Sequence, residues 1–334
     1  MINKNRLRII SIFLKKNYIE NFKIKEIKGD ASFRQYFRIY LKNKSYILAS
    51  AEWEKKSNIL NYVLVNKFLN KKGINAPKVI DYDYKNGLAL LQDFGDKTYL
   101  RLIKKSKNKF HIYQSLIKYL IKIQRINFKT NIFRFKKYNF RILKKEIDLF
   151  FIWYLPRILK IKNNSQIKRL RQLLLSILKN NFINNNYFAH RDFHISNLME
   201  YGDGSQNKIG VIDSQDALIG SRAYDILSLI DDVRIKTNPD LKEKLLNYYL
   251  LLAKKEKNFN IKQFKKEFSI LSVQRAMKII GIFSRLFKRD KKSRYLKLIP
   301  YTWTILNKRL EDPIFKEVRV IINQQIKLRS KNVN

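Results

Sequence analysis

Residues 187–200 concentrate polar side chains of the kinds that carry out chemistry. The segment reads YFAHRDFHISNLME and contains two of the three histidines of the chain. An aspartate and an asparagine lie between and after them. Side chains that could move a proton or hold a metal ion are therefore gathered here, at His190, Asp192, His194 and Asn197.

One interpretation of this segment is phosphoryl transfer. His190-Arg191-Asp192 followed by Asn197 fits H-R-D-x-x-x-x-N, the pattern of a kinase catalytic loop. In such a loop the aspartate orients or accepts the proton of the substrate hydroxyl, and the asparagine gives an amide oxygen to Mg²⁺. Asp213 ends a strand-like run downstream and supplies a second hard oxygen, which suits Mg²⁺. We predict Asp192 as the catalytic residue, with Asn197 and Asp213 as metal ligands.

A second interpretation is a zinc site made by His190 and His194, which are spaced i, i+4. That spacing needs a helix, whereas this segment follows a strand-like run and lacks the pattern H-E-x-x-H. The chain has no cysteine, which excludes disulfides, cysteine-ligated zinc and thiol catalysis. We expect His190, Arg191 and His194 to support the loop structurally.

The elements that precede this segment predict a small sheet. Strand-like runs alternate apolar and polar residues or are short apolar stretches between turns, and helical spacing marks two further segments. The predicted strands are residues 22–25, 34–40, 45–49, 77–80 and 88–92, and the predicted helices are residues 7–14 and 59–68. Gly73 is a natural end for the second helix.

The pattern changes to long helices from residue 96 onward. The predicted helices include residues 110–124, 139–160 and 166–178, with strand-like inserts at 187–189 and 209–212. We therefore predict an α+β fold with a small β-rich lobe and a larger helical lobe. The nucleotide-binding lobe is assigned to residues 1–94, and the helical lobe with the catalytic loop and substrate site to residues 95–334.

Two turns in the N-terminal part are candidate nucleotide contacts. One lies between two predicted strands, where a loop over phosphates would lie, and an ordinary hairpin is the alternative. The other ends the last predicted strand, where an adenine could bond to backbone groups, and an ordinary surface turn is the alternative. The candidate ATP-binding residues are Gly29, Ser32, Phe33, Gln92, Asp93 and Phe94.

Asp225 lies in the first turn of a predicted helix that opens at Ala223. It could be an N-terminal acid that interacts favourably with the helix dipole. It could also be a buried acid that ties down the catalytic loop, which is the interpretation we prefer. Either role is structural.

The composition indicates what class of protein this is but says little about its function. With 334 residues, 45% of them hydrophobic, the chain can bury a sizeable core. Its 71 basic against 27 acidic residues give a net charge of +44, spread along the chain. We attribute this excess to compositional bias and expect no specific nucleic-acid partner, only a non-specific affinity for polyanions. No apolar run approaches the ~20 residues that span a bilayer, so we expect a cytoplasmic protein with no membrane partner.

Three segments resemble the aminoglycoside phosphotransferase (choline kinase-like) superfamily. They are GDASFRQYFRI at 29–39, HRDFHISNLM at 190–199 and VIDSQDALIGSRAYDILSLIDD at 211–232. Within this superfamily the closest likeness is to the bacterial anomeric N-acetylmuramate/N-acetylglucosamine kinases of cell-wall recycling. The likeness runs from about residue 29 to residue 303.

This resemblance implies a bilobal protein kinase-like fold that uses ATP and Mg²⁺. Such enzymes transfer the γ-phosphoryl group to the anomeric hydroxyl of the sugar. The resemblance assigns Asp192 as the catalytic acid/base and Asn197 and Asp213 as metal ligands. Gln215 and Asp216, just beyond the metal acid, become candidate sugar-side residues. The expected partners are ATP and an amino sugar, and the expected state is a monomer.

The chain departs from the kinase pattern at two places. The predicted strand at residues 45–50 has no lysine at its centre or end, where kinases place the lysine that pairs with the α- and β-phosphates. Lys44, at the strand start, is a poor geometric substitute. In addition, Ser214 follows Asp213 where phenylalanine is usual, which would loosen the packing behind the metal acid.

Two other functions stay open. A kinase of this superfamily for choline, ethanolamine, homoserine or an aminoglycoside would need an acidic or aromatic cage for a cationic substrate. A non-catalytic kinase-like protein that binds nucleotide or RNA is favoured by the missing lysine and the positive charge. Asp192, Asn197 and Asp213, all three present, argue against it.

Overall fold

The structure, a computed structural model, describes residues 4–27, 34–51, 56–128, 134–181, 183, 185–202 and 207–327. The chain divides into two compact units. The first comprises residues 1–112, 126–135 and 190–217, and the second comprises residues 113–125, 136–189 and 218–334. The boundary expected between residues 94 and 95 stays a prediction. Gly29, Ser32 and Phe33 lie outside the described residues.

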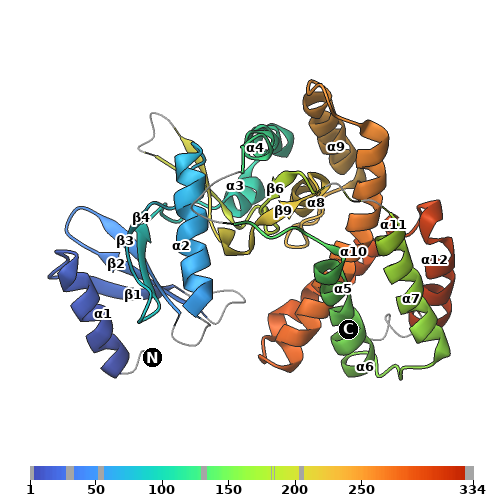
Figure 1. The fold of residues 1–334 in the computed structure, drawn as a ribbon, viewed down its shortest axis with the longest axis horizontal. Coiled ribbons are helices and arrows are strands. Elements are labelled where there is room, and N and C mark those ends of the chain that lie inside the picture. The colour runs from blue at the N-terminus through green and yellow to red at the C-terminus, as the bar shows by residue number, and fades with distance from the viewer. Residues whose placement is uncertain are drawn as a thin grey trace. The chain divides into compact units, whose positions relative to one another are not determined.

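The first unit is built on a five-stranded antiparallel sheet in the order β1-β2-β3-β5-β4. Its strands are β1 (Lys23–Ile27), β2 (Gln35–Tyr40), β3 (Ser45–Ser50), β4 (Val79–Asp83) and β5 (Leu88–Gln92). Two helices accompany it, α1 (Lys4–Lys16) and α2 (Lys56–Lys71), and Figure 1 shows them on opposite sides of the sheet. All five predicted strands and both predicted helices of this region are confirmed.

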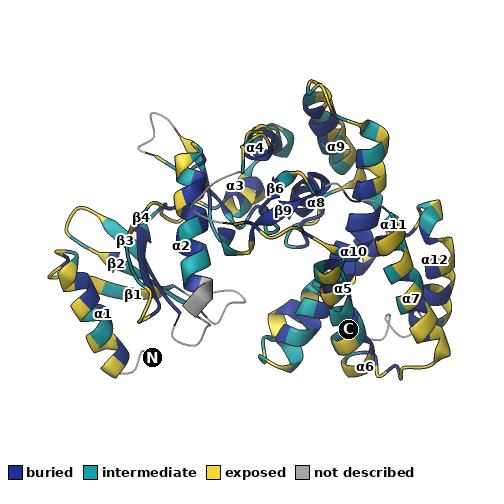
Figure 2. Cartoon of the chain, in the orientation of Figure 1, coloured by how far each residue is buried: buried dark blue, intermediate teal, exposed yellow. Residues whose placement is uncertain are grey.

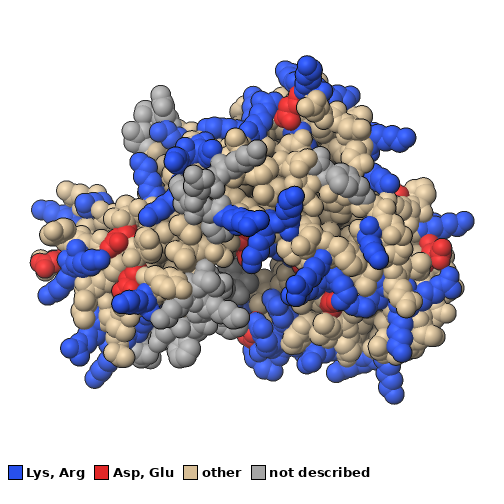
Figure 3. All heavy atoms as spheres, viewed as in Figure 1, with Lys and Arg blue, Asp and Glu red and all other residues tan. Residues whose placement is uncertain are grey.

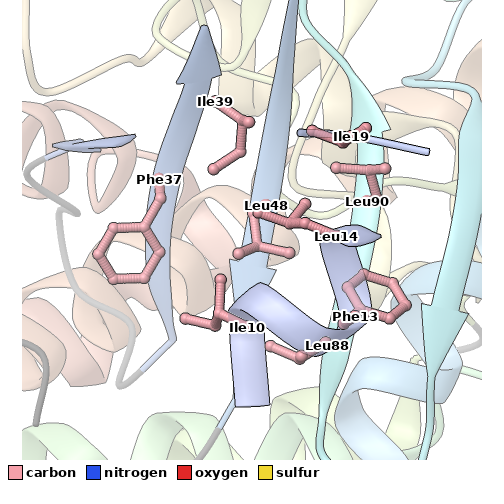
Figure 4. Packing of buried hydrophobic residues seen from close by; sticks show 9 residues of the cluster. All are labelled: Ile10, Phe13, Leu14, Ile19, Phe37, Ile39, Leu48, Leu88 and Leu90. Carbon is pink, nitrogen blue, oxygen red and sulfur yellow. The ribbon is translucent and has the colours of Figure 1, made fainter. Parts of the chain in front are cut away.

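Each face of the sheet buries the apolar side of one helix. Successive side chains of a strand point to opposite faces, so Leu48 joins the core under α1 while Ala49 joins the core under α2. Figure 4 shows the first of these cores, where Ile10, Phe13 and Leu14 of α1 pack with residues of the sheet. The buried residues of both cores are at most 4% exposed, and Figure 2 shows the burial along the strands.

The first unit also contains α3 (Tyr99–Lys105) and a hairpin of β7 (Leu198–Tyr201) and β8 (Lys208–Val211). The strand-like run at 209–212 is β8, but its partner β7 was not predicted. Gly210 of β8 lies against Phe94, whose ring stacks on Tyr201 of β7 at 4.2 Å between ring centroids. A side chain at residue 210 would meet this ring at 2.6 Å.

The second unit is helical apart from the short pair of β6 (Tyr187–Ala189) and β9 (Leu218–Gly220). Its helices are α4 (Lys109–Gln124), α5 (Phe140–Leu149), α6 (Leu155–Arg157), α7 (Ser165–Asn180), α8 (Ala223–Ile230), α9 (Pro239–Ala253), α10 (Ile261–Lys288), α11 (Ile299–Arg309) and α12 (Lys316–Ile322). The predicted helix 139–160 contains a π-helical turn at Phe150–Tyr154. Within the described residues, no helix is long and apolar enough to cross a membrane.

Basic side chains are distributed over the surface. Figure 3 shows Lys and Arg spread across the visible face, with few acidic groups between them. Other basic groups lie deeper and pair with acids, as buried Arg222 does with Glu256 at 2.7 Å and Arg309 with buried Asp231 at 2.9 Å. On this face the positive charge is therefore not collected into one patch.

Gly281 provides a test of the packing of α10 against α5. A Cβ there would lie 2.4 Å from the carbonyl carbon of Leu149 and 2.6 Å from the nitrogen of Phe150, where the π-helical turn begins. Glycine to alanine in a helix interior normally stabilises by about 1 kcal/mol. We expect Gly281→Ala to lower the free energy of unfolding instead, by about 1–3 kcal/mol, because backbone atoms cannot move aside cheaply. Urea unfolding measures this change.

The control is Lys265→Ala at an exposed position of the same helix. Its effect should stay within about 0.5 kcal/mol. If Gly281→Ala stabilises the protein, then α10 does not approach Leu149 as closely as the structure shows.

Candidate functional site

The candidate catalytic loop, residues 190–197, is folded by its own hydrogen bonds. The backbone N–H of His194 donates to the carbonyl oxygen of Asp192 at 2.9 Å, and that of Asn197 donates to His194 at 2.8 Å. Outside the loop, the N–H of Leu100 in α3 donates to the carbonyl of Ile195 at 3.0 Å. Arg191 adopts a left-handed backbone with φ 72°, which is costly for a residue with a side chain. The contacts around it hold the loop in one shape.

The two predicted metal ligands lie at the same end of the β7–β8 hairpin. Leu198 pairs with Val211, and the N–H of Ile212 donates to the carbonyl oxygen of Asn197 at 3.0 Å. Asn197 and Asp213 therefore flank the same end of the hairpin, although 15 residues separate them in the chain. The amide nitrogen of Asn197 donates to the carbonyl of Asp192 at 3.1 Å. This leaves its oxygen, Oδ1, as the atom suited to a metal.

The environment of Asp213 perturbs its carboxyl group strongly. Its backbone is left-handed, with φ 67° and ψ 41°. Burial raises the pKa of its carboxyl group to about 6, and the negative charge of Asp192 acts in the same direction. A hydrogen bond from the Gln215 amide at 2.8 Å and the charge of Arg34 act against the rise. Asp192 and Asp213 are thus close enough to repel one another.

This donor set fits Mg²⁺. The ion takes hard oxygen ligands and is held in proteins by one or two carboxylates together with the phosphates of a nucleotide. Asp213 and the Oδ1 atom of Asn197 are oxygens of this kind, and a cation between Asp192 and Asp213 would offset their repulsion. In the described part of the chain, no cluster of three or more His, Cys, Asp or Glu side chains could hold a metal ion by itself.

Both histidines of the loop are buried, and their supporting role stays a prediction. His190 is fully buried, and burial lowers the pKa of its imidazole to about 4, so the ring is neutral near pH 7. The charge of Asp192 and the backbone of Ile212, directly before Asp213, act against this lowering of the pKa. His194 is 6% exposed. No helix runs through these residues, so they lack the i, i+4 geometry of a zinc pair.

Ser214 packs the segment behind Asp213 against α2. Its side chain is fully buried, and its hydroxyl donates to the Oδ1 atom of Asn66 at 2.8 Å. Serine therefore replaces the usual apolar contact with a buried hydrogen bond. Asn66, in the middle of α2, was not predicted to contribute. The only signal for it in the sequence is that a polar residue stands where the helical spacing predicts the face toward the core.

The remaining candidates lie in different surroundings. Gln215 donates to Asp213, whereas Asp216 is exposed and its carbonyl accepts from Arg191 at 3.1 Å. Asp225 is fully buried in α8 of the second unit. Its suggested link to the catalytic loop stays a prediction, as do the substrate roles of Gln215 and Asp216.

Residues 92–94 are held by hydrogen bonds and packing within the first unit. The Gln92 N–H donates to the carbonyl of Lys78 at 2.8 Å. The Asp93 carboxylate accepts from Ser45 at 2.7 Å and pairs with Arg38 at 2.6 Å. Phe94 is buried over Gly210. Contact of this segment with a nucleotide stays a prediction. Such a contact would have to use the backbone of the segment.

A buried arginine was missed in the sequence. Arg34 directly precedes β2, and only 3% of its surface is exposed. Its guanidinium lies 4.8 Å from the ring centroid of Tyr62 in α2, and its Nη1 atom donates to the hydroxyl of Tyr36 at 3.1 Å. The signal for it was a charged residue two positions before Tyr36, on the side of the strand that faces α2.

Comparison with known proteins identifies the class. Residues 23–258 match the phosphotransferase enzyme family, and the chain belongs to this family. Among curated proteins, it is similar to the N-acetylmuramate/N-acetylglucosamine kinase of Caulobacter vibrioides, with 27% identity over 96% of each chain. It is also 30% identical to the kinase of the same name from Pseudomonas aeruginosa, over 81% of this chain and 79% of that protein.

Solved structures show the same fold. A streptomycin–ATP complex of the enzyme APH(2")-IIa has a TM-score of 0.62 at 15% identity, over 90% of this chain and 96% of that one. The choline kinase LicA of Streptococcus pneumoniae has a TM-score of 0.62 at 12% identity, over 90% of this chain and 99% of that one. The predicted α+β kinase-like fold, with a β-rich N-terminal part and a helical C-terminal part, is confirmed.

The raised pKa of Asp213 predicts an unusual response to substitution. An unfolded aspartate ionises near pH 4, so between pH ~4 and ~6 the folded protein binds this proton more tightly than the unfolded chain. The contribution of Asp213 to stability is therefore fully favourable below pH ~4 and is lost as the pH rises through 6. Without metal and nucleotide, we expect Asp213→Asn to melt at a higher temperature than the wild type at pH 7.5. The gain should disappear near pH 4.

Asp83→Asn is the control, and it should change the melting temperature in the opposite direction. Burial acts to raise the pKa of Asp83, but hydrogen bonds from the side chain and backbone of Asn86 outweigh it and hold the pKa below its usual value. Its removal should lower the melting temperature at pH 7.5. Equal melting temperatures of Asp213→Asn and wild type at pH 7.5 would contradict the electrostatic description of the site.

Proposed function

We propose that this protein is an ATP- and Mg²⁺-dependent kinase that phosphorylates the anomeric hydroxyl of N-acetylmuramate or N-acetylglucosamine. The observation that carries the proposal is the hydrogen bond from Ile212 to Asn197. It holds Asn197 beside the segment that carries Asp213, and the Asn197 amide donates to the backbone of Asp192. Phosphoryl transfer requires residues of these three types. Curated relatives of this chain that span most of its length share the name N-acetylmuramate/N-acetylglucosamine kinase.

Asp192 is the group that handles the proton. Its side chain is half-buried at the loop surface, where a substrate hydroxyl can reach it. Because Asn197 donates to the backbone carbonyl of Asp192, the carboxylate is not needed to hold the loop together. It can accept or orient the proton of the attacking hydroxyl, a role typical of the aspartate in this loop.

Asn197 and Asp213 are the residues that would hold Mg²⁺. The ion supplies positive charge to the phosphates, where negative charge accumulates during transfer. Gln215 fixes one carboxylate oxygen of Asp213 by its hydrogen bond, and Ser214 anchors the next residue to α2. The protein thus contributes fixed oxygen ligands, and little covalent chemistry is left for it to perform.

The acceptor is assigned from the relatives. An amino sugar with a free anomeric hydroxyl presents the alcohol that this reaction class needs, and its phosphorylation gives a 1-phosphate. We place the reaction in the cytoplasm, where ATP is supplied, and we expect the enzyme to act as a monomer.

Asp192→Asn tests the function at the residue that performs the chemistry. The substitution removes the proton acceptor but keeps the size of the side chain. We expect sugar-dependent ADP formation to fall by about 10²–10⁴-fold, with no loss of melting temperature. A coupled ADP assay with N-acetylmuramate and N-acetylglucosamine measures this loss.

Asp240→Asn, an exposed acid in the first turn of α9, is the matched control and should keep wild-type turnover. Turnover by Asp192→Asn within a factor of a few of wild type would overturn the catalytic role. A wild-type protein that turns over no amino sugar would overturn the substrate assignment.

A further inference from the structure

Asn75 holds the strand that leads to Asp213, and both residues belong to the first unit. It lies in the loop between α2 and β4. Its backbone carbonyl accepts from the N–H of Val211 at 2.8 Å, and its side-chain amide donates to the carbonyl of Ile209 at 2.9 Å. β8 is therefore attached to this loop up to two residues before the candidate metal acid.

Asn66 of α2 holds the chain on the other side of Asp213. The hydroxyl of Ser214 donates to its Oδ1 atom at 2.8 Å, and both residues are fully buried. A buried hydrogen bond is costly to break, because a polar group that loses its partner there cannot turn to water instead. The bond joins the middle of α2 to the residue directly after the metal acid.

The backbone of Asp213 needs such a support. Its φ of 67° and ψ of 41° lie in the left-handed region, which costs energy for a residue with a side chain, although aspartate tolerates it better than most. Relaxation of φ and ψ would turn the carboxylate in another direction. The bond between Ser214 and Asn66 fixes the residue next to this strained position and so opposes the relaxation.

We propose that Asn66 is a positioning residue that sets the affinity of the candidate magnesium site through Ser214. This inference rests on the proposed kinase function and deepens it, because it gives α2 a part in metal binding. In many kinases a phenylalanine follows the metal acid and packs against its neighbours. Apolar packing is non-directional, whereas a hydrogen bond has a defined length and direction. The serine–asparagine pair therefore holds Asp213 in one orientation.

Metal binding without turnover tests the proposal. Ser214→Ala removes the donor of the bond, and Asn66→Ala removes the acceptor. We expect each variant to bind Mn²⁺, which takes the same oxygen ligands as Mg²⁺, about 10-fold more weakly. This is the lower end of the effect of hydrogen bonds behind metal ligands. Electron paramagnetic resonance of free Mn²⁺ measures the affinity, with saturating ADP and no sugar.

The double variant distinguishes one shared link from two separate defects. If the two residues act as a unit, the combined Ser214→Ala and Asn66→Ala protein binds Mn²⁺ no more weakly than the weaker single variant. Losses that multiply to about 100-fold would show that the hydrogen bond is not their cause, and the proposal would be wrong. If Asn66→Ala does not fold, Ser214→Ala alone decides.

Ser50→Ala is the matched control. The Ser50 hydroxyl is also buried in the first unit, where it accepts from Arg6 at 2.8 and 3.0 Å. Its loss should lower the melting temperature, as Ser214→Ala does, but leave the Mn²⁺ affinity at the wild-type value. A folded Ser214→Ala protein with wild-type Mn²⁺ affinity would overturn this inference alone. A wild-type protein that binds no Mn²⁺ with ADP would overturn the proposed kinase function, and this inference with it.

Discussion

The burial of Asp213 together with the nearby charge of Asp192 is the constraint on which the rest of the site depends. The two carboxylates are close enough for the charge of one to raise the pKa of the other. Such an arrangement is unfavourable in the absence of a cation, so the surrounding structure must hold it in place. The hydrogen bond between Ile212 and Asn197 does this, as does the one between Ser214 and Asn66. The left-handed backbone of Asp213 is a further local cost. Strain and electrostatic repulsion at one place are what a site built to receive a metal and phosphates would show.

Positive charge near this pair comes from the protein in an unusual way. Arg34 is held between Tyr36 and Tyr62 and acts on Asp213. A guanidinium enclosed between β2 and α2 is fixed by packing.

The order of elements in the first unit could be predicted because each carries a local pattern. Strands such as Ser45–Ser50 and helices such as Lys56–Lys71 follow from apolar spacing and from stops at glycine. Asp192, Asn197 and Asp213 could be selected because their spacing is that of a known catalytic loop. Their gathering at one end of a hairpin could be expected only in part, because β7 was missed.

The missed features depend on contacts that are distant in sequence. The four residues of Leu198–Tyr201 are too few for a periodic signal, and β7 becomes a strand through its pairing with β8. The π-helical turn at Phe150–Tyr154 lies where α5 meets Gly281 of α10, which no local pattern announces. Arg34 looked like one more basic residue in a basic chain. Its burial is set by Tyr62, 28 residues further on.

The measurement that tests the account most directly is the identity of the product. The purified protein would be incubated with ATP, Mg²⁺ and a panel of amino sugars and other alcohols, and the phosphorylated carbon identified by phosphorus NMR. The account predicts a phosphate on the anomeric carbon of N-acetylmuramate or N-acetylglucosamine. A phosphate on another hydroxyl, or transfer only to an alcohol such as choline or an aminoglycoside, would contradict it.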